Sequence, residues 1–166
     1  MAVVALCAAL LIAQQVALAA LPNIELVSLL VMLFTLRFRA KALYIIYVFV
    51  LAEGLIYGFG DWWFMYLYVW TVLAGLTWIF RGLRSPWLFA ALSGAFGLLF
   101  GTLCSFVYLA YYGPAAMIAK WISGLPFDLI HGAANFAVCL ALWKPLYALL
   151  GRLYGRADRG RAGPGG

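Results

Sequence analysis

Residues 86–112 read PWLFAALSGAFGLLFGTLCSFVYLAYY, and no charged side chain occurs in this stretch. A helix that crosses the hydrocarbon core of a bilayer needs about 20 predominantly apolar residues, within a range of about 17–25. The stretch exceeds that length, so we expect a helix that tilts or extends past the lipid. It therefore predicts an integral membrane protein.

The composition of the whole chain supports the same class. Of the 166 residues, 68% are hydrophobic and only 10% are charged, and the mean hydropathy is +1.05. A soluble domain usually carries about a quarter charged residues, so this composition excludes one. Cys7, Cys104 and Cys139 all lie inside apolar runs, which predicts small core residues rather than a disulfide or metal framework.

Gly, Pro and charged residues divide the chain into apolar segments. We predict six transmembrane helices, at residues 2–21, 23–36, 42–57, 62–80, 86–112 and 126–150. These helices should form a single compact all-α bundle over residues 1–150. The basic, Gly- and Arg-rich tail of residues 151–166 is expected to be disordered.

The charged residues predict the orientation of this bundle. Lysines and arginines gather between the second and third predicted helices, between the fourth and fifth (Arg81 and Arg84), and at the end of the sixth with the tail. In a six-helix topology all three places lie on one side, and such enrichment marks the cytoplasmic side. Both termini are therefore expected in the cytoplasm. The net charge of +6 is then a topology signal, and nucleic-acid binding is not expected.

The first predicted helix has an alternative interpretation as a signal peptide. Ala17-Leu18-Ala19 resembles a small-residue cleavage site, but no Lys or Arg precedes Arg37. A signal peptide needs a positively charged region ahead of its apolar segment. We therefore expect residues 1–19 to be retained, which an intact-mass measurement checks.

Two predicted helices carry small residues at four-residue spacing. The first helix has Ala5, Ala9, Ala13 and Ala17, and the fifth has Ser93, Gly97, Gly101 and Ser105. Such stripes allow two helix backbones to approach closely in lipid. We expect the stripe of the fifth helix to pack within the subunit. Gln14 and Gln15 lie in the middle of the first helix, where an amide needs a partner within the protein.

Polar and aromatic residues converge on the predicted outer face, and ionisable residues in or beside lipid suggest function by default. Simpler explanations exist for several of them. Asn23 and Glu25 fit a helix start, Trp62 and Trp63 fit an aromatic belt at the membrane interface, and Asp128 fits a helix cap. An aromatic cavity with a few polar groups is typical of small-molecule sites. The combination favours a ring-bearing, polar, vitamin-like ligand.

The sequence offers no catalytic or metal-binding arrangement. Asp128, His131 and Asn135 share one helix face, but one nitrogen and two oxygens are a thin ligand set for a transition metal. No phosphate-binding loop, paired-histidine motif or activated nucleophile is evident. We therefore expect no enzyme and no cofactor, and a membrane enzyme using Asp128 and His131 is the weakest alternative.

Three segments resemble the S components of energy-coupling factor (ECF) transporters: residues 17–30 (ALAALPNIELVSLL), 53–60 (EGLIYGFG) and 124–132 (GLPFDLIHG). With the size and six-helix topology, the likeness covers nearly the whole chain. The resemblance implies a subunit of the bacterial cell membrane that binds a vitamin at its extracellular side. It also implies docking, through an alanine-rich face of the first helix, against a T component driven by two cytoplasmic ATPases, and toppling in the bilayer.

The resemblance and the outer cluster together define the candidate residues. The docking face would comprise Ala5, Ala9, Ala13 and Ala17. The substrate-binding residues would be Asn23, Glu25, Glu53, Tyr57, Asp61, Trp62, Trp63, Tyr66, Lys120, Trp121, Asp128, His131 and Asn135. The vitamin itself stays open among riboflavin, thiamine, biotin, folate, cobalamin and queuosine precursors. The alternative function is a stand-alone proton- or cation-coupled carrier, in which Glu53 or Asp128 titrates.

Overall fold

The computed structural model describes residues 2–21, 23–83 and 85–161, and the side chains of these ranges up to residue 153. Within this part of the chain the fold is all-helical and contains no strand, which confirms the predicted class. The elements are α1 (Ala2–Leu18), α2 (Val27–Phe38), the 3-10 turn η1 (Arg39–Lys41), α3 (Ala42–Tyr57), α4 (Asp61–Ile79), α5 (Pro86–Tyr112) and α6 (Pro114–Arg161). The predicted basic position Arg84 and the last five residues of the predicted tail, 162–166, lie outside the described residues.

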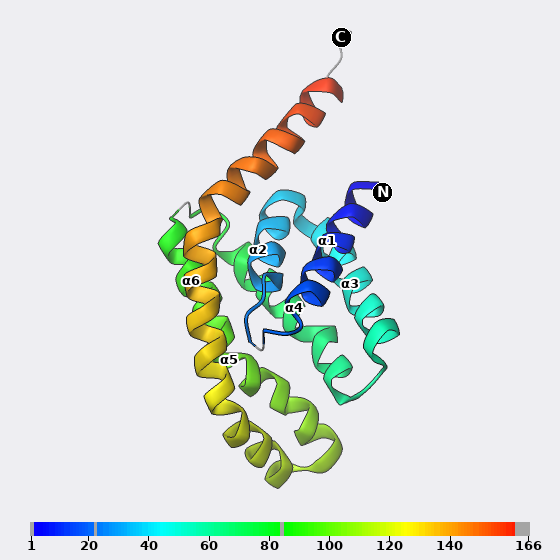
Figure 1. The fold of residues 1–166 in the computed structure, drawn as a ribbon, viewed down its shortest axis with the longest axis vertical. Helices are drawn as coiled ribbons and strands as arrows, with labels where there is room; N and C mark the ends of the chain where they lie inside the picture. The colour runs from blue at the N-terminus through cyan, green and yellow to red at the C-terminus, as the bar shows by residue number, and fades with distance from the viewer. Residues whose placement is uncertain (1, 22, 84, 162–166) are drawn as a thin grey trace.

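Consecutive helices run up and down along the long axis of the molecule (Figure 1). The start of α1 and the end of α6 lie at one end, together with η1. The connections between α1 and α2, between α3 and α4, and between α5 and α6 lie toward the other end. The molecule therefore has two distinct ends, which are called here the terminal end and the turn end.

Four segments of the described chain are long and apolar enough to cross a membrane: Val27–Tyr57, Asp61–Ile79, Pro86–Tyr112 and Pro114–Leu153. The first of these contains both α2 and α3, because η1 joins them without a break in the helical segment. α1 is apolar but has 17 residues, the lower limit of a spanning helix. Length and composition thus give the chain the character of a membrane protein.

The last helix differs from its predicted range at both ends. α6 begins at Pro114 instead of residue 126, so Lys120 and Trp121 lie in a helix and not in the predicted loop. Gly113, at φ 83°, ends α5, and Pro114 starts the next helix without losing an intrahelical bond. α6 also continues through residues 151–161, where disorder was expected, because an existing helix extends without a new nucleation step.

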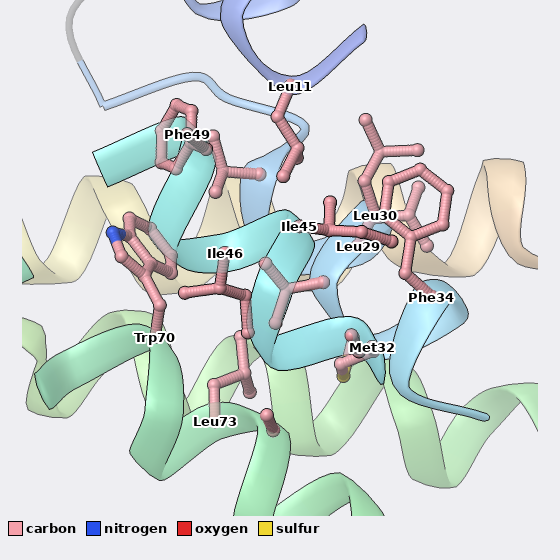
Figure 2. Packing of buried hydrophobic residues seen from close by; sticks show 14 of the residues in the cluster. Leu11, Leu29, Leu30, Met32, Phe34, Ile45, Ile46, Phe49, Trp70 and Leu73 are labelled. Atoms are coloured by element: carbon pink, nitrogen blue, oxygen red, sulfur yellow. The ribbon is translucent and has the colours of Figure 1, made fainter. Parts of the chain in front are cut away.

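The part of the apolar core shown in Figure 2 lies where α1, α2, α3 and α4 meet, and the core continues between α5 and α6. Leu11 of α1, Ile45 of α3 and Leu73 of α4 are completely buried there. α2 is the central helix, since every residue from Val27 to Thr35 is buried. A helix that is apolar on all sides is stable only when other helices surround it, and this surrounding explains how a helix of 12 residues is held.

α5 and α6 pack together through glycines of the small-residue stripe. A Cβ atom at Gly97 would lie 2.8 Å from the Cα of Gly132, and one at Gly94 would lie 3.2 Å from the carbonyl oxygen of Gly132. Ser93, in the same stripe, is buried as well. The structure therefore confirms that this stripe packs within the subunit.

Replacing Gly97 by alanine should destabilise the protein. The new methyl group would meet the backbone of Gly132, which cannot move aside as a flexible side chain can, so we expect a loss of about 1–3 kcal/mol. The measurement is thermal unfolding of the purified protein in detergent. Gly75→Ala is the matched control, because a Cβ at Gly75 would meet no atom within 4 Å. Equal melting temperatures for the two variants would contradict the close α5–α6 contact.

Candidate functional site

A cavity of about 380 Å³ lies toward the turn end, bounded by the α1–α2 connection, α4, α5 and α6. Its volume is within the range of about 300–1,000 Å³ found for small-molecule sites. The polar residues that line it are Gln15, Asn23, Glu25, Lys120, Asp128 and His131, and aromatic walls come from Tyr66, Trp70, Phe100 and Phe127. The structure thus brings six of the sequence-predicted binding residues into one cavity: Asn23, Glu25, Tyr66, Lys120, Asp128 and His131.

Glu25 is the centre of a hydrogen-bond network that joins α2 to α6. One carboxylate oxygen accepts the backbone N–H of Ser28 at 2.9 Å, and the other accepts the Ser28 hydroxyl at 2.5 Å. That second oxygen also lies 3.3 Å from Nε2 of His131. Asn135 completes the network from beneath by donating its amide to the Ser28 hydroxyl at 3.1 Å.

This network gives Glu25 two roles. It satisfies a free N–H at the start of α2, as the helix-start interpretation predicted, and it also faces the cavity beside His131. Asn135 does not line the cavity, and its amide reaches Glu25 only through the Ser28 hydroxyl, two hydrogen bonds away. Ser28 and Asn135 are each 1% exposed, so water cannot replace either partner. The position of the carboxylate is therefore set by the protein itself.

Asp128 lines the cavity from α6. Its Oδ1 accepts the backbone N–H of Gly101 at 2.9 Å, whereas its buried Oδ2 has no hydrogen-bond partner among the described residues. Gly101 must lack a side chain, because a Cβ there would lie 2.8 Å from Oδ1 of Asp128. Asp128 therefore lines the cavity with one carboxylate oxygen bonded to α5 and the other buried against Gly101.

The aromatic side chains form a connected wall. The ring of Trp70 packs edge-on against Tyr66 at 5.4 Å and lies 5.8 Å from Phe100, whose ring is 5.0 Å from that of His131. Trp70 is 2% exposed, so the packing role that its depth in the helix suggested is correct, although it also lines the cavity. Flat rings and cations suit such a wall.

Lys120 lines the cavity from the first part of α6. Its ammonium group lies 5.5 Å from the ring centroid of Tyr108, a cation–π distance. The cavity therefore combines a cation with the carboxylates of Glu25 and Asp128, and it can contact both donor and acceptor groups of a ligand.

Three other predicted site residues use their polar atoms to join helices outside the cavity. Trp63 donates its indole N–H to the carbonyl of Val50 at 2.9 Å, and Trp121 donates its own to the hydroxyl of Thr102 at 3.0 Å. Asp61 accepts the hydroxyl of Tyr112 at 3.2 Å. These contacts tie α3 to α4, α5 to α6 and α4 to α5.

Glu53, Tyr57 and Trp62 also lie outside the cavity lining. Glu53 is 2% exposed and its Oε1 has no hydrogen-bond partner in the described part of the chain. Tyr57 is exposed at the end of α3. Trp62 packs edge-on against Tyr66 at 5.3 Å, so it supports the aromatic wall from behind.

The sequence interpretation missed several residues of the site. Ser28 was not considered, although its position three residues after Glu25 at a helix start is a recognisable capping pattern. Gly101 was assigned only to helix packing and Cys104 only to the apolar core, and Met65 and Phe100 were not singled out. Nothing in their local sequence distinguishes these apolar residues from other core positions.

The face of α1 that carries the alanine stripe is exposed. Ala5, Ala9, Ala13 and Ala17 all point away from the bundle, and Cys7, Ala8, Leu11 and Gln14 are buried on the other side. Gln14 accepts the backbone N–H of Leu26 at 2.9 Å and donates to the carbonyl of Leu11. The expected structural role of Gln14 is confirmed, since its amide holds the start of α2 against α1.

Comparisons with protein-family models, with curated proteins and with solved structures find no match for this chain. Within the described residues no group of three or more His, Cys, Asp or Glu side chains is placed to hold a metal ion. The three cysteines are buried, as their apolar surroundings predicted.

Ser28→Ala should destabilise the fold. The change removes the hydroxyl that connects Glu25 to Asn135 and leaves the buried Asn135 amide without its acceptor, so we expect a loss of about 1–3 kcal/mol in the free energy of unfolding. Ser123→Ala is the matched control, because the hydroxyl of Ser123 is exposed and bonds only to the carbonyl of Lys120. Thermal unfolding in detergent checks the difference, and an equal effect of both substitutions would contradict the network.

Proposed function

We propose that this protein is the substrate-binding S component of an ECF-type importer, which captures a vitamin-like molecule in the cavity at the turn end. The observation that supports this most is the cavity itself, in which an aromatic wall adjoins Asp128, a residue whose buried Oδ2 has no hydrogen-bond partner among the described residues. The resemblance of residues 17–30, 53–60 and 124–132 to S components points to the same role. In this proposal the chain binds its ligand and catalyses no reaction.

The geometry suggests how the ligand is held. A buried carboxylate oxygen without a partner costs free energy, and a ligand N–H, O–H or cationic group that reaches it removes that cost. The rings of Tyr66, Trp70 and Phe100 would stack against a flat or positively charged ring. Lys120 would contact an acceptor or anionic group on the same molecule. The substrate class is therefore a polar, ring-bearing micronutrient with at least one hydrogen-bond donor.

The remaining parts of the proposal concern the membrane and the partners. All six helices would span the bacterial cell membrane, with both termini in the cytoplasm and the cavity at the extracellular side. The up-and-down course of the helices (Figure 1) is compatible with that topology. A T component would dock on the exposed alanine face of α1, and two cytoplasmic ATPases would supply the energy.

Asp128→Asn should weaken ligand binding while preserving the fold. Asparagine keeps an oxygen that can accept from Gly101 but removes the negative charge of the free carboxylate oxygen. A hydrogen bond to a charged group contributes about 1.5–3 kcal/mol, so we expect the dissociation constant to rise roughly tenfold or more. Native mass spectrometry of the purified protein identifies the co-purified ligand, and calorimetry with that compound measures the change.

The matched control is Asp61→Asn. Asp61 also accepts a hydrogen bond and lies near the same end of the molecule, but it contacts Tyr112 outside the cavity. Its substitution should change the dissociation constant less than about twofold, since no direct charged contact to the ligand is lost. Failure to bind any of riboflavin, thiamine, biotin, folate or cobalamin, with no co-purified compound, would contradict the capture role.

Ala9→Trp should block uptake and leave binding intact. A large side chain in the middle of the exposed alanine face would keep a partner helix from approaching, but the cavity lies elsewhere. The measurement compares ligand affinity of the purified variant with uptake by cells that express it with a T component and ATPases. Ala133→Trp, at an exposed alanine of α6, is the control and should keep uptake within about twofold of the unsubstituted protein. Equal uptake by the two variants would exclude docking at Ala9.

A proton- or cation-coupled carrier is the second candidate. The observation in its favour is Glu53, a carboxyl group that is 2% exposed and has one oxygen without a partner among the described residues. Such a group in an apolar segment is a common element of proton relays. Uptake by this chain alone that disappears with an uncoupler would favour the carrier, whereas uptake that needs partner ATPases favours the importer.

A further inference from the structure

A second, larger cavity of about 840 Å³ lies at the terminal end of the molecule. It is bounded by η1, by the connection between α4 and α5, and by α6, three segments that come together near that end in Figure 1. Its cationic lining residues are Arg39, Arg81 and Lys144, one from each of these segments. Three positive side chains from separate parts of the sequence therefore surround one space.

The positive charge of this cavity is not neutralised within the described side chains. None of the three cations lies within ion-pair distance of a carboxylate among the described side chains; the contact of that length is between Nε2 of His131 and Glu25 in the other cavity. The lining contains no Asp or Glu. Like charges brought together without a counter-charge repel one another, so the arrangement favours an anionic occupant.

Aromatic side chains give the cavity a rigid wall and orient one of the cations. The guanidinium of Arg81 lies 4.5 Å from the ring centroid of Trp78 and donates one N–H to the carbonyl of Trp78 at 3.0 Å. Trp143 stacks on Phe89 with ring centroids 4.1 Å apart. A guanidinium has five N–H donors, so most of those of Arg81 are left for a ligand.

The backbone at Arg39 is a further sign of a site. Arg39 has φ 55° and ψ −131°, a conformation that side-chain-bearing residues rarely adopt and that glycine adopts without strain. Such strained positions cluster at ligand sites. A glycine would make the same turn between α2 and α3 more easily, and the arginine instead places a cation beside the cavity.

Topology alone accounts for basic residues at a membrane surface, but it does not require them to share a cavity. Lys41 and Arg152 lie toward the same end of the molecule and are exposed, as the three lining cations are, but they do not line the space. The three lining cations therefore call for an explanation beyond orientation.

We propose that this cavity binds the phosphate-containing headgroup of an anionic phospholipid. Guanidinium groups match phosphate oxygens in two-point contacts, and basic pockets between membrane helices are suited to such headgroups. Apolar lining residues, among them Leu36, Leu83 and Phe89, adjoin the cations and would contact the lipid's glycerol and first methylene groups. The volume is also far larger than one inorganic phosphate needs. This inference does not depend on the proposed transport function.

The test compares two charge-matched double variants of the full chain. Arg81→Gln/Lys144→Gln removes two cations from the cavity, and Lys41→Gln/Arg152→Gln removes one Arg and one Lys from exposed positions outside it. Each protein is placed in detergent with equal amounts of phosphatidylglycerol and phosphatidylcholine, and retained lipid is measured by native mass spectrometry. We expect the cavity variant to lose phosphatidylglycerol affinity on the order of thirtyfold and the control less than about threefold.

Arg39→Gly separates lipid binding from folding. It should weaken phosphatidylglycerol retention about fivefold while the melting temperature stays equal or rises, because glycine relieves the backbone strain at this position. Unchanged lipid retention in this variant would contradict a site that includes Arg39.

A final comparison identifies the source of the phosphate. The melting temperature of the protein is compared in inorganic phosphate and in chloride at equal ionic strength. A higher melting temperature in phosphate, lost in Arg81→Gln/Lys144→Gln, would support phosphate recognition with a soluble ligand as its source. Equal retention of the two lipids by the unsubstituted protein, or equal losses in both double variants, would overturn the proposal. So would a cavity that responds to neither lipid nor phosphate, as expected if an acidic protein segment were the true occupant.

Discussion

The close approach of α5 and α6 at Gly97 and Gly132 is the contact on which the candidate binding site depends. Because neither residue has a side chain, the two backbones touch, and Gly101, one turn further along α5, comes within hydrogen-bond distance of Asp128. The same approach brings His131 against Phe100. A wider spacing of these helices would remove the acceptor for the Gly101 N–H and move Asp128 away from the cavity. The packing of two apolar helices thus determines where a carboxylate is presented.

The second constraint is the need to satisfy polar groups in an apolar interior. Gln14 accepts the backbone N–H of Leu26, and Glu25 accepts the backbone N–H and the hydroxyl of Ser28. That hydroxyl in turn accepts the side-chain amide N–H of Asn135. Leaving any of these groups without a partner would cost about 1–3 kcal/mol, which makes the arrangement specific as well as stable. The central helix α2 is short and buried over most of its length, so these bonds at its start also fix its position relative to α1 and α6.

The two ends of the molecule differ in the charge that their cavities present. The turn end holds Glu25 and Asp128 beside an aromatic wall, with Lys120 as the single cation in the lining. The terminal end gathers three cations and no carboxylate in its lining. A polar, ring-bearing molecule suits the first cavity, and a phosphate group suits the second. The separation of basic and acidic residues along the sequence therefore predicts the membrane topology and also corresponds to two cavities that favour ligands of different charge.

The sequence by itself determined the features that depend on local composition. Apolar length predicted an all-helical membrane-type chain, and the spacing of Ser93, Gly97 and Gly101 predicted close helix packing. Side chains three or four residues apart lie on the same face of a helix, so the spacing of small residues predicts a packing face without knowledge of the fold.

Only the tertiary structure decided which polar residues share a cavity. The sequence predicted binding roles for Asp61, Trp63 and Trp121 as it did for Asp128 and His131. In the structure, however, Asp61 bonds to Tyr112, Trp63 to Val50 and Trp121 to Thr102, each on a neighbouring helix. Ser28 and the start of α6 at Pro114 were likewise not predicted. A polar side chain is available to a ligand only if no other helix satisfies it, and that depends on contacts between residues far apart in the chain.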